Sequence, residues 1–467
     1  MQDMDANALN QTLLSYMEKQ KVSAIRKDAA AKRRFRQRKS WAAFNGNLTD
    51  RQFRRYFRMS RECFRDLCSR IEENVGESQF KSEQYLRNLK QSSDPADKKT
   101  LKIMKCHEKS TGGFISGEVK LAITLRILAG GSYLDLALLY DTSSSHAYDI
   151  FHSVINNWIL DDKLVKISGI DYMNDDKRLE EVAMIFLRKS DGVLAGCIGA
   201  IDGWLVKIIQ PSYKDGVKYP GTFFSRKGFY ALNVVAIVDR DKRVLYRVIQ
   251  ARGAEHDSTA FKNTKLYAWL EKNWEWLKLK KYYFIGDSAY SLKSFLLTPY
   301  DNVCHGTAED NYNFFHSASR ICVECTFGEI DLRWGILWRP LKFSLAHNIK
   351  VVDACMRLHN FIVDYRLEHR ETSAMDELEM SLFDDDCRRF LATETNVGSF
   401  GVAGGEDDVR RDAHGNVLRG GRPPTSQVTL TNIGKAIRDK LRNKIQLERR
   451  VRPSKNWFRH NNRFIGN

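Results

Sequence analysis

The stretch Ala195–Asp202, AGCIGAID, is an apolar run that ends on an acidic residue and is followed by Gly203. A second run of the same kind, Tyr282–Asp287 (YYFIGD), also ends on an aspartate. A third acid, Glu324, lies further along in a segment that mixes aromatic and basic residues. Short apolar runs bounded by turn residues are typical of buried strands. We therefore expect the two aspartates at the ends of two strands.

Three carboxylates carried by two strands and a later segment can converge at one edge of a sheet. Carboxylate oxygens are preferred ligands of Mg²⁺ and Mn²⁺. Two such ions about 3.5–4 Å apart can stabilise the attacking and leaving oxygens of a phosphoryl transfer. We predict that Asp202, Asp287 and Glu324 are catalytic metal ligands whose carboxylates lie roughly 4–8 Å apart. If Glu324 faced away, Glu329 would be the acid to consider in its place.

The positive charge of the chain is concentrated near its two ends. The net charge is +17; residues 21–39 carry nine Lys and Arg against one Asp, and residues 435–463 carry eleven against two acids. Basic ends around a neutral body indicate a polyanionic partner such as a nucleic acid, or a nuclear import signal and hence a nuclear location. Solvated charge on helices and tails is the alternative interpretation.

Other features of the composition exclude several classes of protein. The 467 residues are enough for two or three domains. No apolar run of about 18 residues is present, so no transmembrane helix and no membrane partner are expected. The polar start, MQDMDANALNQ, lacks the apolar core of a signal peptide. Nine scattered cysteines, an odd number, indicate reduced thiols.

The chain is expected to have four parts. Residues 1–48 are basic and weakly ordered, and residues 49–165 form a helical domain. Residues 190–366 form a mixed α/β domain, and residues 370–467 are a largely disordered tail with a basic C-terminal segment. Within the helical domain, the polar stretch 77–111 is expected to be a linker.

Part of the helical domain is similar to a helix-turn-helix. Helices are expected over 49–73, 116–129 and 133–140 and after the Ser143 cluster, where Tyr148, Phe151, Ile155 and Trp158 would point inward. A short helix and a polar turn between two longer helices resemble a helix-turn-helix that binds DNA. An ordinary helical bundle gives the same pattern.

The apolar periodicity changes to that of strands after residue 190. Strands are expected over 193–201, 204–209, 231–238, 244–250 and 282–286, and helices over 261–277, 319–336 and 345–366. Several strands followed by helix, strand, helix and helix indicate a mixed α/β layer fold.

Several motifs in this region resemble, in order, those of Harbinger-type transposases, which are DDE transposases. The resemblance covers residues 190–365 and extends more loosely into the helical domain. The matching segments are Gly199–Gly203 (GAIDG), Phe224–Gly228 (FSRKG), Asn233–Ala236 with Asp239, Gly253–Ser258 (GAEHDS), Gly286–Tyr290 (GDSAY), Arg320 with Val323 and Glu324, Phe327 with Gly328, Arg333 with Trp334, and Leu358–Phe361 (LHNF).

The resemblance implies an RNase H-like mixed-sheet domain whose Asp202, Asp287 and Glu324 bind divalent metal, Mg²⁺ or Mn²⁺ and two ions per site. The implied reaction is phosphodiester hydrolysis followed by strand transfer, so the chain would be a DNA endonuclease or transposase. The implied partners are double-stranded DNA, a separately encoded Myb-like DNA-binding protein and further copies of the chain assembled on DNA.

Other residues in the matched motifs are candidates for supporting roles. His256 could contact a phosphate and Asp257 could be an auxiliary carboxylate beside the metals; caps at a helix start are the alternative. The basic residues of the motifs are expected to contact DNA phosphates, although ordinary surface charge would look the same. These residues are Arg226, Lys227, Arg320 and Arg333.

The chain departs from the family pattern at two places near the expected DNA path. Trp204 and Leu205 replace a polar or His-containing pair, and Asp331 replaces a basic residue that often follows the third acid. The departures leave metal binding in place and bear on strand transfer. The pair Cys322 and Cys325 brackets Glu324, and buried thiols explain it better than a zinc site because a second ligand pair is missing.

Three functions therefore compete at this point. An active endonuclease or transposase accounts for the intact acidic triad and the basic ends. A domesticated, catalytically weak DNA-binding or scaffold protein would retain the same fold. A different hydrolase with an acidic metal site would not need the basic ends.

Overall fold

The computed structural model describes four long stretches of the chain, residues 41–102, 115–167, 169–369 and 425–448, together with Glu18, Lys21 and Arg450. The expected disordered tail up to residue 424, and the basic segment 21–39 except for Lys21, therefore lie outside the described residues. The chain divides into two compact units between Trp158 and Ile159.

The first unit is helical throughout its described residues. Its core includes an aromatic cluster in which the Trp41 and Phe64 ring centroids lie 5.0 Å apart. Several of its helices begin after a serine whose side chain accepts a hydrogen bond from an otherwise unpaired backbone N–H of the first turn. Ser60, Ser116 and Ser143 do so. Its helices are α2 (Trp41–Gly46), α3 (Asp50–Phe57), α4 (Arg61–Val75), α5 (Glu77–Phe80), α6 (Glu83–Gln91), α8 (Gly117–Leu128), α9 (Tyr133–Leu139) and α10 (Ser144–Val154).

Three expectations for this unit need correction. The helix expected over 49–73 is two helices, because Arg58 has a φ of 64° and ends α3 before Ser60 starts α4. The expected linker after residue 77 instead contains α5 and α6. Tyr148 of α10 was expected inside and is 40% exposed, whereas Phe151 is buried as expected.

The second unit is built on a five-stranded mixed sheet, so the expected mixed α/β architecture is confirmed. The strand order is β3-β2-β1-β4-β5, with β1, β2 and β3 antiparallel and β1, β4 and β5 parallel. The strands are β1 (Cys197–Lys207), β2 (Ala231–Val238), β3 (Val244–Arg252), β4 (Tyr283–Ile285) and β5 (Leu296–Leu297).

The register of the two central parallel strands brings Asp202 and Asp287 together. Ala200 of β1 pairs with Ile285 of β4, and each aspartate lies two residues beyond its member of this pair. Neighbouring strands are about 4.8 Å apart, and side chains two residues apart share a face. The two carboxylates therefore lie side by side, with Asp287 just past the end of β4.

Asp202 does not lie at a strand end as expected. The strands expected over 193–201 and 204–209 are one strand, β1, in which Asp202 pairs with Ala236 of β2. Because β4 has three residues, β1 continues past it, paired on its other side with β2. Asp202 therefore has no strand beside it on one side because β4 ends there, and not because β1 ends.

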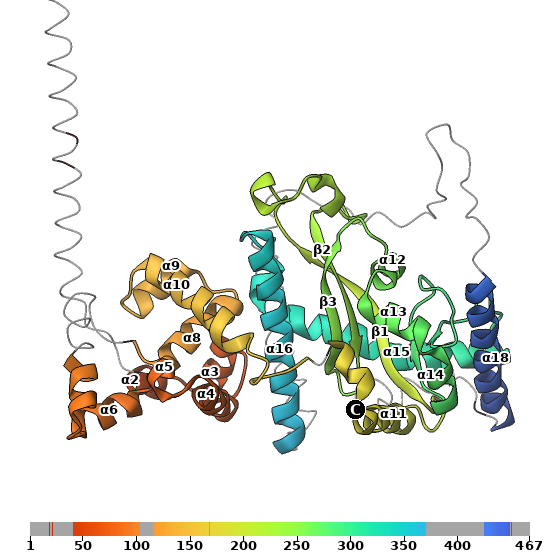
Figure 1. The fold of residues 1–467 in the computed structure, drawn as a ribbon, viewed down its shortest axis with the longest axis horizontal. Coiled ribbons are helices and arrows are strands. Elements are labelled where there is room, and N and C mark those ends of the chain that lie inside the picture. The colour runs from red at the N-terminus through yellow and green to blue at the C-terminus, as the bar shows by residue number, and fades with distance from the viewer. Residues whose placement is uncertain are drawn as a thin grey trace, which may run out of the picture. The chain divides into compact units, whose positions relative to one another are not determined.

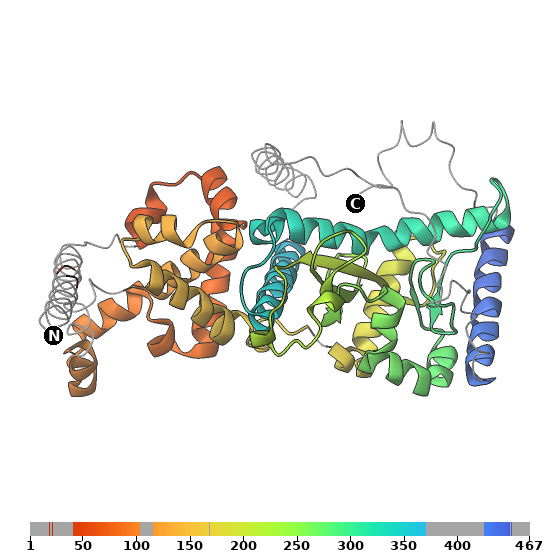
Figure 2. The ribbon, with the colours of Figure 1, turned by 90° about the horizontal axis from the view of Figure 1, so that it is seen from above.

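Helices cover both faces of the sheet. Trp204 of β1 stacks on Phe327 of α15, whereas a Cβ on the preceding Gly203 would meet Asp257 of α12. Figure 2 shows α15 along one side of the sheet and α13 and α14 on the other. The helices are α11 (Asp176–Lys189), α12 (Asp257–Lys262), α13 (Lys265–Lys272), α14 (Trp274–Lys280), α15 (Ala308–Arg333) and α16 (Leu345–His369); the single helix expected over 261–277 is thus three.

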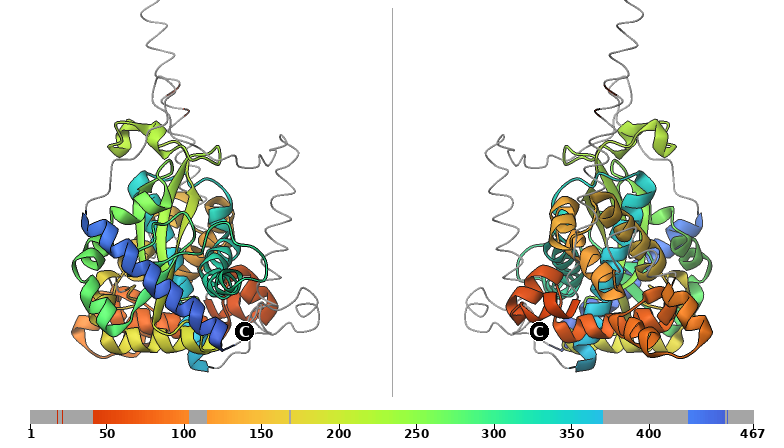
Figure 3. Two further views of the ribbon diagram at one scale, coloured as in Figure 1. Left: turned by 90° about the vertical axis from the view of Figure 1, so that its right-hand side faces the viewer. Right: turned by 90° about the vertical axis from the view of Figure 1, so that its left-hand side faces the viewer.

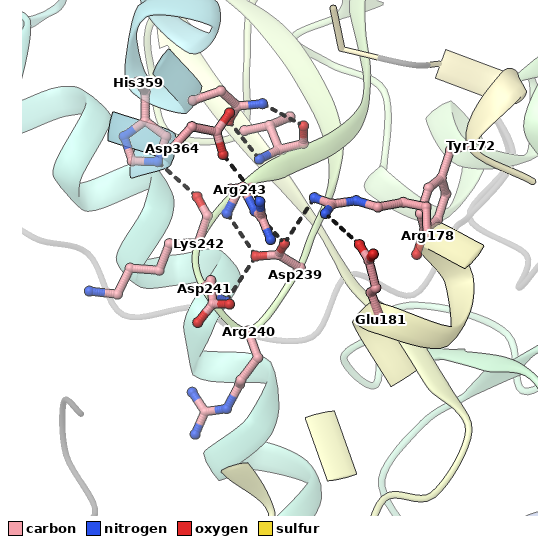
Figure 4. A network of polar contacts seen from close by, with 12 residues as sticks. Tyr172, Arg178, Glu181, Asp239, Arg240, Asp241, Lys242, Arg243, His359 and Asp364 are labelled. Carbon is pink, nitrogen blue, oxygen red and sulfur yellow. Dashed lines mark hydrogen bonds and ion pairs between the residues drawn. The ribbon is translucent and has the colours of Figure 1, made fainter. Parts of the chain in front are cut away.

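The β2–β3 turn is fixed by a buried polar network (Figure 4). Asp239 is fully buried and accepts a 3.0 Å bond from Arg243 Nε, while Arg178 Nη2 of α11 lies 3.7 Å away. On α16, Asn360 bonds both backbone groups of Val244, and a ring nitrogen of His359 lies 2.8 Å from the Lys242 carbonyl oxygen. The LHNF motif therefore secures this turn to α16.

The C-terminal helix α18 (Thr425–Leu447) packs on the second unit, against α15 and β5. The Arg438 guanidinium lies 3.8 Å from the centroid of the Tyr300 ring, and its Nη1 donates to the Pro299 carbonyl. The Tyr300 hydroxyl donates in turn to Asp439. Figure 3 shows α18, in blue, lying diagonally across this side of the unit.

Further basic residues of α18 also form hydrogen bonds to other parts of the second unit. Arg442 Nη1 donates to Glu309 at the start of α15 (2.8 Å), and Lys444 Nζ donates to the Gly192 carbonyl (2.9 Å). The expectation that the basic segment from residue 435 is free for DNA therefore needs correction for these residues, because their charges join α18 to the domain. The helix also begins at Thr425, within the tail that was expected to be largely disordered.

Gly434→Ala tests the close approach of α18. A Cβ at this position would lie 2.5 Å from the Lys293 carbonyl oxygen and 2.6 Å from its carbon, both backbone atoms. Alanine normally favours a helix over glycine by about 1 kcal/mol. We expect the opposite sign here, a loss of about 1–3 kcal/mol, because the helix must move outward. Thermal unfolding measures it, with exposed Lys435→Ala as control; a stabilised Gly434→Ala variant would contradict the packing of α18.

Candidate active site

Arg320 joins two of the three predicted metal ligands. It lies on α15 one turn before Glu324 and points to the sheet, where Nη1 donates to Asp202 Oδ2 over 3.0 Å. Its Nη2 donates to Glu324 Oε1. Glu324 therefore does not face away from Asp202. Asp287 lies beside Asp202 on the neighbouring strand, so the structure places Asp287 next to Asp202 and links Glu324 to Asp202 through Arg320.

The charges in this cluster act on one another. Burial raises the pKa of Asp202 to about 6; the Gly203 N–H and Arg320 oppose the shift, whereas Asp287 and Asp257 add to it. Burial also raises the pKa of Asp287, against the influence of Arg320. Removal from water disfavours a charged carboxylate, and nearby carboxylates disfavour it further.

Asp257 is the fourth acid of the cluster, and its position depends on residues that sequence reasoning missed. Asn233 Nδ2 of β2 donates to Asp257 Oδ1 over 2.7 Å and also to the Glu255 carbonyl. The carboxyl group lies over Gly203, where any Cβ would come within 2.2 Å of it. Asp257 is therefore directed at β1 and does not cap α12. The available signal was Asn233, a polar residue within the otherwise apolar strand ALNVVAIV.

The residues of this corner fit a hard divalent cation by their donor chemistry. Asp202 on β1, Asp287 just past the end of β4 and Glu324 on α15 border the corner, and carboxylate oxygens suit Mg²⁺ and Mn²⁺. The hydroxyl of Tyr290 is buried beside Asp257, Asp202 and Asp287 and has no hydrogen-bond partner among the described residues. Within the described residues, however, no group of three or more His, Cys, Asp or Glu side chains is arranged to hold a metal ion.

The predicted DNA-binding residues lie in different environments. Arg226 and Lys227 are exposed in the loop before β2, and Arg226 is near enough to Asp287 to lower the pKa of that carboxyl. His256, at the N-cap of α12, is exposed as well. Arg333 is fully buried, so the expectation of a DNA contact needs correction for this residue: its guanidinium cannot reach a phosphate in this structure.

Three further residues near Glu324 lie outside the cluster. Glu329 bonds Lys242 of the β2–β3 turn, so it does not replace Glu324. Of the two cysteines, Cys322 is buried and Cys325 is exposed. The expectation of buried thiols therefore holds for Cys322 and is wrong for Cys325.

The two departures from the family pattern are in contact with each other. The indole Nε1 of Trp204 donates to Asp331 Oδ2 over 3.2 Å. Burial raises the pKa of Asp331 from 3.8 to about 7, while the Trp204 bond and the charge of Lys207 oppose the shift. The aromatic residue on β1 and the acid on α15 thus form a local pair.

Asp331→Asn should change stability in a pH-dependent way. The pKa of Asp331 is higher in the folded protein than in the unfolded one. Below about pH 4 the carboxyl is protonated in both states, so it does not lower the stability of wild type. As the pH rises to about 7, wild type progressively loses stability because the folded protein resists ionisation of this group. The half-buried group is partly screened, so we expect the variant to be about 1–2 kcal/mol more stable than wild type at about pH 8 and equal to it at about pH 4. Denaturant unfolding at several pH values measures the difference; a constant difference would contradict the buried pair.

Comparisons with known proteins find relatives for most of the chain. Residues 201–360, which lie within the second unit, match the family described as DDE superfamily endonuclease. Protein ALP1-like of Arabidopsis thaliana is 23% identical over 336 residues, covering 69% of this chain and 73% of that protein. HARBI1 of Bos taurus and of Homo sapiens, each named as a candidate nuclease, are 25% identical over 178 residues.

The resemblance to Harbinger-type transposases is therefore confirmed. The chain spans about half the length of HARBI1, 48% for the Bos taurus protein. No solved structure matches the chain. No helix in the described stretches is long and apolar enough to cross a membrane.

Proposed function

We propose that this chain is a divalent-metal-dependent DNA endonuclease of transposase type, with an RNase H-like catalytic domain in its second unit. The observation that carries the proposal is the convergence of Asp202, Asp287 and Glu324 from β1, the end of β4 and α15. The reaction is hydrolysis of a DNA phosphodiester, followed by transfer of the resulting 3′ end to a second strand. The match to DDE superfamily endonucleases supports this reaction class.

Each residue of the cluster has a definable task in this proposal. Asp202, Asp287 and Glu324 would hold Mg²⁺ or Mn²⁺, two ions per site, with Asp257 as an auxiliary carboxylate fixed by Asn233. When bound, the ions neutralise charge on the attacking and leaving oxygens. The exposed Arg226 and Lys227 bind phosphates beside the carboxylates, which sets the scissile bond near the ligands.

The wider assembly follows from the same proposal. Double-stranded DNA is the substrate, and the basic segment 21–39 supplies affinity for it together with nuclear import. His256 is exposed at the start of α12 and can contact a phosphate there. The first unit contributes a helix-turn-helix-like surface built from α8, α9 and α10. A separate Myb-like protein and further copies of the chain complete recognition of the DNA ends.

A domesticated DNA-binding or scaffold protein is the second candidate function. Two observations favour it. The Arg320 guanidinium is hydrogen-bonded to two of the three triad acids, and position 331 carries an aspartate where relatives often carry a basic residue. In that case the fold and the DNA contacts persist while turnover is weak. Cleavage measured with Mg²⁺ or Mn²⁺ separates the two functions.

Asp202→Asn should abolish cleavage and leave the fold intact. The change keeps the size of the side chain and removes a metal-binding charge, so we expect nicking of supercoiled plasmid in Mn²⁺ to fall by at least about 100-fold. Asp171→Asn, at an exposed position of the same unit, is the control and should cleave normally. Cleavage that resists both EDTA and Asp202→Asn would contradict the triad.

Deletion of residues 21–39 should flatten the salt dependence of DNA binding. Each phosphate contact contributes about 0.9 to the slope of log affinity against log salt, so nine basic residues can account for several units. Binding to all sequences should weaken alike. Fluorescence anisotropy on one duplex at several salt concentrations measures the slope. An unchanged slope would assign the contacts to core residues, with Arg226→Ala plus Lys227→Ala as the comparison.

A further inference from the structure

The guanidinium of Arg320 stands where the acids of the candidate site converge. It donates to Asp202 on the sheet and to Glu324 on its own helix, and its side chain is 17% exposed. Asp287 lies close enough that its charge also acts on Arg320. The acids of the site thus face a positive charge that belongs to the protein.

We propose that Arg320 is a displaceable counter-cation, which holds the acids of the site in place before metal arrives and must release Asp202 for metal to bind. This inference rests on the proposed function and adds a regulatory contact to the same site. Arg320 then has two states, one bound to Asp202 and Glu324 and one turned away from them.

Competition for the same oxygens is the physical reason. The Asp202 Oδ2 atom that accepts from Arg320 is one that a cation would use, and Glu324 is likewise engaged. A divalent ion brought next to a guanidinium is also repelled by its charge. The site therefore binds metal more weakly than its acids alone would allow, since part of the binding free energy is spent in breaking the Arg320 contacts.

The same contact stabilises the metal-free protein. Asp202, Asp257 and Asp287 are half-buried in one corner, and like charges at short range repel. Arg320 offsets this repulsion and fastens α15 to β1. Its removal should destabilise the protein without metal, and bound metal should restore the lost stability because the ion supplies the missing positive charge. A purely structural arginine would not be replaced by metal in this way.

Mn²⁺ binding to the full chain tests the proposal. We would measure it by titration calorimetry for wild type, Arg320→Gln, Arg320→Lys and Asp202→Asn. Arg320→Gln should bind Mn²⁺ about tenfold more tightly than wild type, equivalent to about 1.4 kcal/mol. Arg320→Lys keeps the charge but loses the forked contact to two carboxylates, so it should fall between the two. Asp202→Asn should abolish the binding, which assigns it to this site.

Thermal unfolding supplies the second readout. In EDTA, Arg320→Gln should melt several degrees below wild type, and in saturating Mn²⁺ the difference should close. Equal or weaker Mn²⁺ binding by Arg320→Gln would overturn the proposal, as would a melting difference that metal leaves unchanged. If Arg320→Gln does not fold by circular dichroism, Arg320→Lys decides, and unchanged Mn²⁺ affinity in that variant overturns the proposal.

Failure of this inference is distinguishable from failure of the proposed function. A protein that does not cleave DNA but binds Mn²⁺ more tightly after Arg320→Gln supports the counter-cation and contradicts the endonuclease. A protein that cleaves DNA but shows no change in Mn²⁺ affinity after Arg320→Gln supports the endonuclease and contradicts the counter-cation.

Discussion

Repulsion among acids is the constraint on which the second unit depends. Asp202, Asp257 and Asp287 are half-buried in one corner of the sheet, with Glu324 at its edge, and carboxylates so placed need positive charge or hydrogen-bond donors beside them. Arg320 supplies charge, and Asn233 supplies a donor. A fold that only had to be stable would place apolar residues here. The arrangement is understandable if the corner exists to receive a cation.

Parts of the chain that are far apart in sequence keep this corner in shape. The register of β1 against β4 sets the two aspartates side by side, and α15 carries Arg320 and Glu324 to them. The network around Asp239 anchors the β2–β3 turn to α11 and α16. At the other end, α18 holds the beginning of α15 through Arg442 and Glu309. Helix α18 is therefore part of the second unit.

The local pattern of apolar residues predicted which helices and strands form better than it predicted where they end and which elements they pack against. The strand over 231–238 and the helix beginning at Leu345 agree with the structure because continuous apolar periodicity marks them. Asp202 was expected at a strand end because Gly203 usually signals a turn; the short length of β4, which decides the matter, is a tertiary property.

The charged side chains were the least predictable part of the site. Basic residues in a matched motif or a basic segment look available for DNA, yet Arg320 contacts acids, Arg333 is buried and Arg438 stacks on Tyr300. Whether a basic side chain faces solvent or a carboxylate depends on which distant residues the fold places next to it. The neighbouring residues in the sequence do not reveal this. The proximity of Asp202 and Asp287 was predictable because each of them follows an apolar run within a recognisable motif.

The most direct test of the account is a crystal structure of the chain grown with Mn²⁺, with the ions located by their anomalous scattering. The account predicts anomalous peaks between Asp202 and Asp287 and next to Glu324, with the Arg320 guanidinium no longer bonded to Asp202. Mn²⁺ found elsewhere, or Arg320 still bridging Asp202 and Glu324 in crystals saturated with the metal, would contradict it.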